Sequence, residues 1–212
     1  MTIAADWVTI SALATAAGTL VLALATFASV RSANRAARVA ERSLLAGLRP
    51  LLMPSRLEDT PQKVNFVDGK ELVAPGGGAV ADYSDEAVYL AAALRNVGEG
   101  IAVLHGFHFY PERVTAAGHP EPEEFTRLTR DLYIAMGDVG FWQGAFRDPS
   151  APGFAEARAA IAEHGDWTVD VLYGDAEGGQ RMVSRYTMVP REGGQWLAAV
   201  GRHWNLDRAA PR

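Results

Sequence analysis

The chain has 212 residues, of which 49% are hydrophobic and 21% are charged, so it is expected to fold rather than to stay disordered. It contains no cysteine, which excludes disulfides, thiolate metal sites and a cysteine nucleophile. Residues 1–50 hold five arginines against two acids, a net +3, so with a total of −5 the remaining residues carry −8. An acidic domain lacks the basic surface that phosphate contacts need, and we expect no nucleic-acid partner.

A membrane-spanning helix is predicted over residues 7–30, after a tail of residues 1–6. This stretch, WVTISALATAAGTLVLALATFASV, has no charged residue between Asp6 and Arg31. At about 1.5 Å per residue it spans roughly 36 Å, enough to cross a ~30 Å hydrocarbon core with some tilt. A cleaved signal peptide fits less well, because the tail carries no Lys or Arg and the apolar run exceeds about 15 residues. A buried helix of a soluble domain is the other alternative.

The charges that flank this helix predict its orientation. Four arginines follow it within a short segment, whereas residues 1–6 carry only an acid. The positive-inside rule therefore places the domain that follows in the cytoplasm and the tail outside. We expect a single-pass protein of the cytoplasmic membrane with the lipid bilayer as a partner.

An amphipathic juxtamembrane helix is predicted over residues 31–49, because no Pro or Gly lies between Gly18 and Gly47 and Pro50 follows. One face of this helix is basic and the opposite face is small and apolar. The basic face consists of Arg31, Arg35, Arg38, Arg42 and Arg49, and the apolar face of Ala33, Ala37, Ala40, Leu44 and Leu48. We expect Arg31, Arg35, Arg38 and Arg42 to contact the membrane surface, at about 1 kcal/mol each near anionic headgroups. A stop-transfer flank on a solvated helix is the alternative.

Small residues recur at four-residue spacing in the membrane helix, as Ala12 with Ala16 and as Ala14 with Gly18. Such spacing lets helices approach closely in lipid. Ala14 and Gly18 are therefore candidates for association with a second copy or with another membrane protein. An alanine-rich helix also contains such spacings by accident.

From residue 50 the hydrophobic pattern changes to a period of two, which predicts one β domain over residues 50–212. Asp68-Gly69 predicts a hairpin with a two-residue loop. Residues 74–85 are expected to form a flexible loop, and GDVGFWQGAF, residues 137–146, a glycine-rich turn region. Strands are expected over residues 87–97, 101–110, 131–136, 167–173, 181–189 and 195–204.

One short helix is expected inside this domain over residues 154–164, with Ser150 and Pro152 at its start and Gly165 at its end. In the strand over residues 101–110, the odd-numbered side chains are expected to share one face. The fold class that follows is mainly β. It comprises a transmembrane and juxtamembrane helix followed by an immunoglobulin-like β-sandwich with one short inserted helix.

No motif for chemistry stands out. The glycine-rich turn over residues 96–100 lacks the lysine and the following helix of a phosphate loop. His105 and His108 have a spacing that places them on opposite faces of a strand, which argues against a shared metal ion. Asp175 and Glu177 are too few ligands for calcium, and turn chemistry explains their loop better. We expect no catalytic residue, no cofactor and no metal site.

Four segments of the sequence, taken together, carry a resemblance to known proteins: LRNVGEGIA, DLYIAMGDVGFWQGAFRD, WTVDVLYGDAEGGQRMVSRYTMVP and VGRHWNLDR. Over most of its length the chain resembles uncharacterised single-pass membrane proteins of high-GC Gram-positive bacteria. The Asn-x-Gly-x-Gly-x-Ala turn is similar to those of bacterial immunoglobulin-like modules. The resemblance implies a membrane anchor and a β-sandwich, and it brings no activity or catalytic residues.

The function expected from the sequence is a non-enzymatic, membrane-anchored interaction or sensing module. One alternative is a subunit of a larger membrane complex, in which the helix provides lateral contacts. A second alternative is a membrane-tethered hydrolase or metal enzyme, built from His203, Asp207, Asp170 and Asp175 with His105 or His108. That enzyme would need these side chains to surround one pocket.

Overall fold

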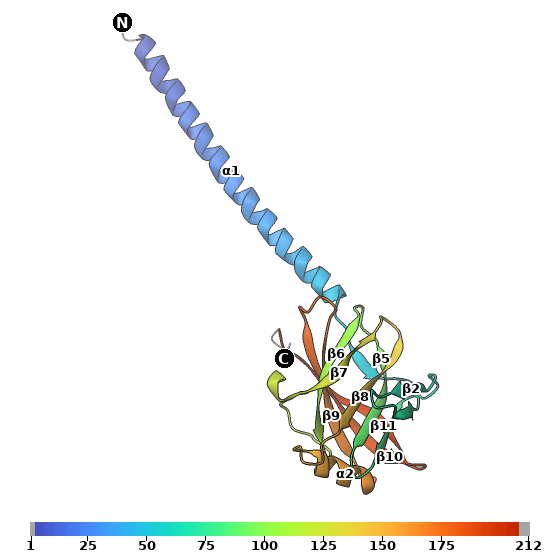
Figure 1. Ribbon diagram of the computed structural model, residues 1–212. Coiled ribbons are helices and arrows are strands. Elements are labelled where there is room, and N and C mark those ends of the chain that lie inside the picture. The colour runs from blue at the N-terminus through green and yellow to red at the C-terminus, as the bar shows by residue number, and fades with distance from the viewer. Residues whose placement is uncertain (1–2, 208–212) are drawn as a thin grey trace. The chain divides into compact units, whose positions relative to one another are not determined.

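The computed structural model describes residues 3–207 and divides the chain into two compact units, Met1–Ala46 and Gly47–Arg212. The first unit is a single long helix and the second is a mostly antiparallel β domain with one short α-helix (Figure 1). The prediction of a mainly β protein with an N-terminal helix and one inserted helix is therefore confirmed.

Helix α1 runs without interruption from Ile3 to Gly47, over 45 residues. The absence of proline permits this length, and the hydroxyls of Thr15, Thr19 and Thr26 donate to the carbonyl four residues earlier, so they need no outside partner. The segment Trp7–Glu41 is long and apolar enough to cross a membrane. Arg49, expected on the basic helix face, lies beyond the helix end.

Eleven strands, one α-helix and one 3₁₀ turn make up the described part of the β domain. They are β1 (Leu52–Pro54), β2 (Gln62–Asn65), β3 (Glu71–Ala74), β4 (Gly78–Tyr83), β5 (Val88–Asn96), β6 (Ala102–Tyr110), η1 (Pro122–Glu124), β7 (Thr126–Ile134), β8 (Val139–Phe146), α2 (Phe154–Ala162), β9 (Trp167–Gly174), β10 (Arg181–Arg191) and β11 (Gln195–Asn205).

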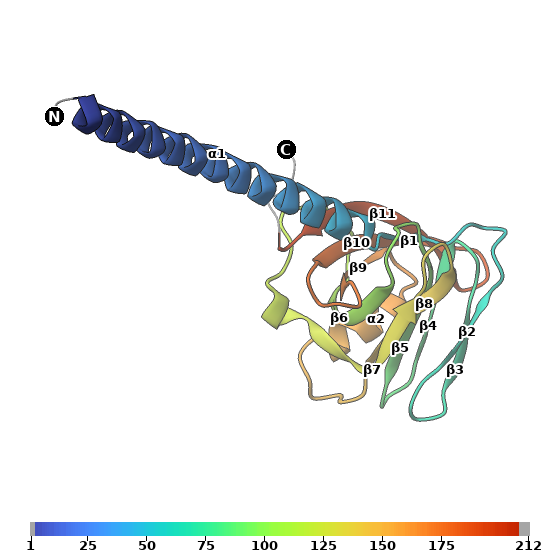
Figure 2. The same cartoon turned by 90° about the horizontal axis from the view of Figure 1, so that it is seen from above.

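Nine of these strands form one antiparallel sheet in the order β1-β5-β4-β11-β10-β9-β6-β7, with β8 also paired to β5. Strand β8 covers one edge of β5, and β4 and β1 share the other edge. The far ends of the sheet approach each other, since Arg130 of β7 donates to Gln143 of β8 at 3.3 Å. The sheet thus curves around an interior (Figure 2).

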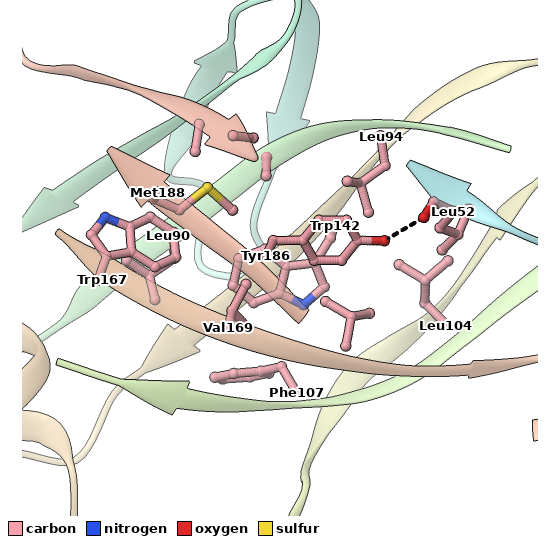
Figure 3. Close-up of a cluster of buried hydrophobic side chains, with 14 of the residues drawn as sticks. Leu52, Leu90, Leu94, Leu104, Phe107, Trp142, Trp167, Val169, Tyr186 and Met188 are labelled. Carbon is pink, nitrogen blue, oxygen red and sulfur yellow. Dashed lines mark hydrogen bonds between the residues drawn. The ribbon is translucent and has the colours of Figure 1, made fainter. Parts of the chain in front are cut away.

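The interior of this curved sheet holds the main hydrophobic core, and nearly every strand contributes to it. The alternating residues of β9, which are Trp167, Val169, Val171 and Tyr173, are all fully buried there. Trp142 of β8 lies edge-on to Phe107 of β6, with ring centroids 5.4 Å apart (Figure 3). Such packing aligns the strands without requiring any polar group in the centre.

The hairpin of β2 and β3 forms a second, two-stranded sheet that packs on the outer face of β5 and β8. Strand β5 is therefore buried on both faces, which explains its unbroken apolar sequence. The hairpin itself is confirmed, but its loop is longer than two residues. The amide of Phe66 donates to the carbonyl of Lys70, and Gly69 has φ of 82°, which only glycine adopts easily.

Two predictions of irregular structure are wrong. Residues 78–83, expected in a flexible loop, form β4, which pairs with β5 and β11. Residues 139–146, expected in a turn region, form β8, which pairs with β5 along its whole length. In both cases glycine-rich sequence suggested a turn, but pairing with a buried neighbour overrides this local preference. Gly144 is a glycine because a Cβ there would lie 2.8 Å from the Trp142 ring.

The predicted single face of β6 is also wrong, because a β-bulge interrupts the strand. The register shifts between Leu104 and Gly106, against both neighbouring strands. Leu104 points into the core before the bulge, and Phe107 points into it after the bulge. His105 is the extra residue and is exposed.

Helix α2 is confirmed, but its ends differ from those predicted. The cap is Gly153 with φ of 85°, and Ser150 instead binds Asp148 in the preceding turn. At the end, the amide of Gly165 donates to the carbonyl of Ala160. The buried face of α2 contributes Phe154 and Ile161 to the main core.

The glycine-rich turn after β5 packs against the segment through which the chain enters the β domain. The buried side chain of Asn96 accepts hydrogen bonds from the amides of Leu51 and Gly98 and donates to the carbonyl of Gly100. A Cβ at Gly100 would lie 1.8 Å from the carbonyl oxygen of Leu48. Close backbone approach therefore explains the glycines that suggested a phosphate loop.

Candidate functional site

The most elaborate polar site of the domain is centred on Arg185, which lies directly opposite Asp170 where β10 pairs with β9. Both side chains are almost completely buried, at 4% and 0% exposed. Two guanidinium nitrogens bind the carboxylate, Nε at 2.7 Å and Nη2 at 2.6 Å. This two-point contact is the strongest geometry for such a pair.

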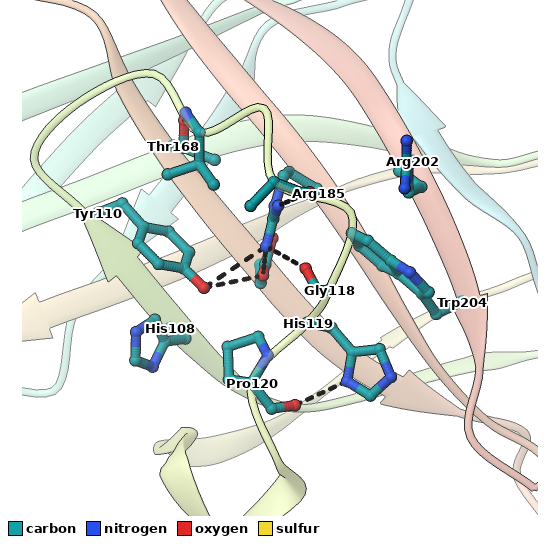
Figure 4. Close-up of polar contacts among 12 residues, drawn as sticks. His108, Tyr110, Gly118, His119, Pro120, Thr168, Arg185, Arg202 and Trp204 are labelled. Carbon is teal, nitrogen blue, oxygen red and sulfur yellow. Dashed lines mark hydrogen bonds and ion pairs between the residues drawn. The ribbon is translucent and has the colours of Figure 1, made fainter.

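Aromatic rings on both sides complete the surroundings of the Arg185 guanidinium (Figure 4). Its central carbon lies 5.3 Å from the ring centroid of Tyr110 and 5.0 Å from that of Trp204. The Tyr110 hydroxyl donates to Asp170 at 3.3 Å. Burial and the Asp170 charge raise the pKa of Tyr110 to about 12, and the bond to Asp170 raises the pKa of Arg185. Both groups keep their protons at ordinary pH.

The loop after β6, residues 111–121, closes over this ion pair. Arg185 donates to the carbonyls of Ala116 and Gly118 at 2.9 and 3.1 Å. The carbonyl between them, of Ala117, accepts from Arg202 and from the indole of Trp204 at 3.1 and 3.2 Å. Since its donors already have acceptors, Arg185 orders this loop and is not available to a substrate.

A wide cavity of about 790 Å³ lies nearby, between β6, β7 and the loop before β10. Its apolar floor includes Phe125 and Leu172, both less than 10% exposed. His105, Arg127 and Arg181 place polar groups at its sides. Burial lowers the pKa of His105, with Asp131 acting in the opposite direction and Arg181 in the same direction as burial. The apolar floor is therefore surrounded by more polar groups than line a typical ligand pocket, which is mainly apolar.

The residues that the enzyme hypothesis needed lie in separate contacts. Asp170 binds Arg185, Asp207 binds Arg181 at 2.8 Å, and His203 accepts or donates a 2.6 Å bond with Ser184. His108 contacts the carbonyl of Glu124 at 3.2 Å. Ser184 is fully buried, so a substrate has no access to this Ser–His pair.

In the loop that was predicted to be a turn rather than a calcium site, the carboxylate binds the backbone of the same loop. Asp175 accepts a hydrogen bond from the amide of Gly179 at 2.8 Å. Within residues 3–207, no group of three His, Asp or Glu side chains is placed to hold a metal ion.

Arg185 was not among the sequence candidates. A signal for it exists, because an Asp stands inside the apolar strand WTVDVLYG and an Arg stands inside the apolar run MVSRYTMVP of the next strand.

The residues predicted to contact the membrane and to associate lie on α1. Arg31, Arg35 and Arg38 are exposed, as are Ala14 and Gly18. The side chain of Arg42 lies outside the described residues. Comparison of the chain with protein-family models, with curated proteins and with solved structures finds no match.

Proposed function

We propose that this protein is a single-pass, membrane-anchored module for interaction or sensing, with no enzymatic activity and with its β domain on the cytoplasmic side. The observation that carries the proposal is the surface of α1. Leu20, Leu24 and Phe27 are each more than 60% exposed, in a run without charge. An apolar surface of this length is unfavourable in water, and a bilayer removes it from water.

The arginines after the apolar run support the proposed orientation. Because α1 continues as one helix, Arg31 lies at the end of the apolar run, and Arg38 lies seven residues or about 10 Å further along the axis. The first of these residues are thus the best placed for anionic headgroups. The rest of the chain carries the acidic excess and would remain in the aqueous phase.

The β domain supports an interaction role through its cavity beside His105 and Arg127. Its volume of about 790 Å³ falls within the usual range for ligand sites, roughly 300–1,000 Å³. Its apolar floor and mixed charges suit a ligand or peptide that has both apolar and charged parts. Most of the residues considered for a hydrolase or metal enzyme are instead bound to side chains outside that set or to the backbone, which favours the non-enzymatic function.

Extraction of cell membranes with alkaline carbonate tests the anchor. Replacing Leu20 and Leu24 together by Arg places two charges in the middle of the apolar run, at about 3 kcal/mol each in a bilayer. We expect this variant to be found in the soluble fraction and the wild-type protein in the pellet. Leu44→Arg, outside the run, is the matched control and should stay in the pellet. A wild-type protein that is released by carbonate would refute the anchor.

Protease treatment of sealed spheroplasts tests the orientation, with a tag placed after Arg212. A protected tag is expected. A digested tag would place the domain outside the cell and would direct the search to envelope or extracellular ligands. The immunoglobulin-like relationship of the domain and its bacterial origin remain predictions from the sequence.

A second candidate function, as a subunit of a membrane complex or a homo-oligomer, is favoured by a seven-residue repeat in α1. Positions spaced alternately by three and four residues carry no charge over the whole helix, and none is larger than Leu. They are Thr9, Ala12, Ala16, Thr19, Ala23, Thr26, Val30, Ala33, Ala37, Ala40, Leu44 and Gly47. Arg31, Arg35 and Arg38 lie on the side of α1 away from this repeat.

The repeat and the Ala14–Gly18 pair lie on different faces of α1, so the two can be tested separately. The chain has no natural cysteine, and Ala37→Cys should therefore form a disulfide-linked dimer in membranes if the repeat faces a second copy. Arg38→Cys is the matched control and should remain monomeric. Ala14→Leu with Gly18→Leu should abolish recovery of a complex only if that second face is the one used.

A further inference from the structure

A chain of hydrogen bonds links β11 to the first residue of β1. The amide of Leu52 donates to the hydroxyl oxygen of Tyr173 at 3.2 Å. That hydroxyl lies 2.8 Å from Ser184 Oγ, and Ser184 Oγ lies 2.6 Å from His203 Nδ1. Tyr173 and Ser184 are fully buried, whereas His203 is partly exposed. The chain of bonds thus runs from the interior to a group that solvent protons reach.

The direction of these bonds follows from their first member. A backbone amide can only donate, so the Tyr173 oxygen accepts from Leu52. The Tyr173 proton then needs an acceptor of its own, and Ser184 Oγ lies in reach at 2.8 Å. Ser184 in turn donates to His203 Nδ1, which must therefore carry a lone pair. The arrangement is complete only when His203 is neutral, with its proton on Nε2.

Leu52 is also held through its carbonyl, which accepts from the hydroxyl of Tyr186 at 2.9 Å (Figure 3). Two buried tyrosines therefore bind both polar backbone groups of this residue. Leu52 directly follows Pro50 and Leu51, the segment through which the chain enters the β domain. Any change in the bonds to Leu52 acts on this entry point.

We propose that His203 is a proton-sensitive latch for the entry segment: the neutral imidazole keeps Leu52 bound, and protonation of Nδ1 weakens that attachment. A protonated Nδ1 donates to Ser184, so the Ser184 proton must turn to one of the two tyrosine oxygens that contact it, those of Tyr173 and Tyr186. Both tyrosine hydroxyls also bind Leu52, so this rearrangement disturbs the bonds that hold Leu52.

Among the described residues, His203 contacts the hydroxyl of Ser184 on β10, and beyond it lie those of Tyr173 on β9 and Tyr186 on β10. Arg49 of the entry segment acts on Tyr173, whose pKa is raised chiefly by burial. On β11 itself, Arg202 is directed to the carbonyl of Ala117. Burial lowers the pKa of His203 below its ordinary value of 6.5.

The sign of the pH effect follows from this direction. A histidine whose pKa is lower in the folded state than in the unfolded state destabilises the fold when it must bind a proton. The attachment of Leu52 is therefore complete above about pH 6.5 and is lost as the pH falls through the lowered pKa of His203.

Nuclear magnetic resonance of the full chain in detergent micelles tests the latch, with ¹⁵N-leucine and ¹³C-labelled histidine. The Leu52 amide and the His203 ring should titrate with one midpoint, below 6.5. Protection of the Leu52 amide against hydrogen exchange, corrected for the intrinsic rate, should fall on the order of tenfold across that midpoint.

Three variants distinguish a latch from a merely structural contact. His203→Asn keeps an acceptor at the δ position without titrating, so Leu52 should show no pH response. In Ser184→Ala, His203 should still titrate but Leu52 should no longer follow. His105→Asn removes another histidine of lowered pKa and should leave the Leu52 response unchanged. A flat Leu52 signal in the wild-type protein, or a response that persists in His203→Asn, would overturn the proposal, whether or not α1 spans a membrane.

Discussion

In α1, Arg31, Arg35 and Arg38 are exposed and make no hydrogen bond or ion pair with any described residue, whereas Arg185 of the β domain is buried and bound to Asp170, Ala116 and Gly118. The apolar residues differ in the same way. Leu20 and Phe27 of α1 are more than 60% exposed, and Leu90 and Trp142 of the β domain are fully buried. Most groups of the β domain contact other residues of the same domain, whereas α1 leaves an apolar surface and a row of charges exposed. The two regions should therefore respond differently to substitution and to their surroundings.

The largest loss of stability is expected on removing the charge opposite Arg185. Asp170→Asn leaves a buried guanidinium without its counterion, which should lower the free energy of unfolding by about 3–5 kcal/mol. Denaturant unfolding of the full chain in detergent, followed by tryptophan fluorescence, measures it. The matched control is Asp85→Asn, which breaks an ion pair with Arg158 in which the carboxylate is 91% exposed. It should have a far smaller effect, and equal effects would mean that the buried pair has no special weight.

The next largest effect is expected at the entry segment. Gly100→Ala places a Cβ at 1.8 Å from the carbonyl of Leu48, so the backbone must move. We expect a loss of about 1–3 kcal/mol, as for other overpacked sites. Gly118→Ala has no atom within 4 Å of the added Cβ and serves as the control. The same unfolding measurement tests this prediction. An unchanged free energy of unfolding in Gly100→Ala would mean that the entry segment is loosely held.

A smaller effect, graded along α1, is expected for the arginines. Near an anionic surface each contributes about 1 kcal/mol, and the effect fades within a Debye length of about 10 Å at 0.1 M salt. Arg31→Gln should therefore reduce the association of spin-labelled anionic lipid with the reconstituted protein more than Arg38→Gln does. Electron paramagnetic resonance measures this association. Equal losses at both positions would contradict a helix in which Arg38 lies further from the membrane surface than Arg31.

The smallest effect is expected at acid pH on the hairpin. Burial acts to raise the pKa of Asp68, but hydrogen bonds from Arg147 at 2.8 Å and Tyr89 at 2.7 Å prevail and lower it from 3.8 to about 2. The stability that Asp68 adds is present above about pH 4 and is lost as the pH falls through about 2. Asp68→Asn should therefore lose less stability than the wild-type protein over this range. Parallel acid titrations that follow circular dichroism would reveal the difference, and coincident curves would rule it out.

Local patterns were sufficient for several elements of the fold. The length of α1, the β2–β3 hairpin, the buried β5 and the alternation of β9 follow from residue spacing, which is a property of neighbours along the chain. The patterns failed at β4 and β8. Their glycines indicate turns locally, but pairing with β5 and the space beside Trp142 and Phe107 require small residues in strands. Asp170 and Arg185 show the same limit, because the cross-strand register brings them together and the loop over residues 111–121 covers them.

The sequence by itself determined the division of this protein into a long apolar helix with a basic extension and an acidic, mainly β domain. Hydrophobic periodicity and charge distribution are enough to predict this division, because both are patterns among residues that lie close together along the chain. Only the tertiary structure decided which polar residues meet: Asp170 with Arg185, and His203 with Ser184, Tyr173 and the amide of Leu52. The physical reason is that these contacts join residues up to 121 positions apart, and their geometry depends on strand order and register, which no local pattern contains.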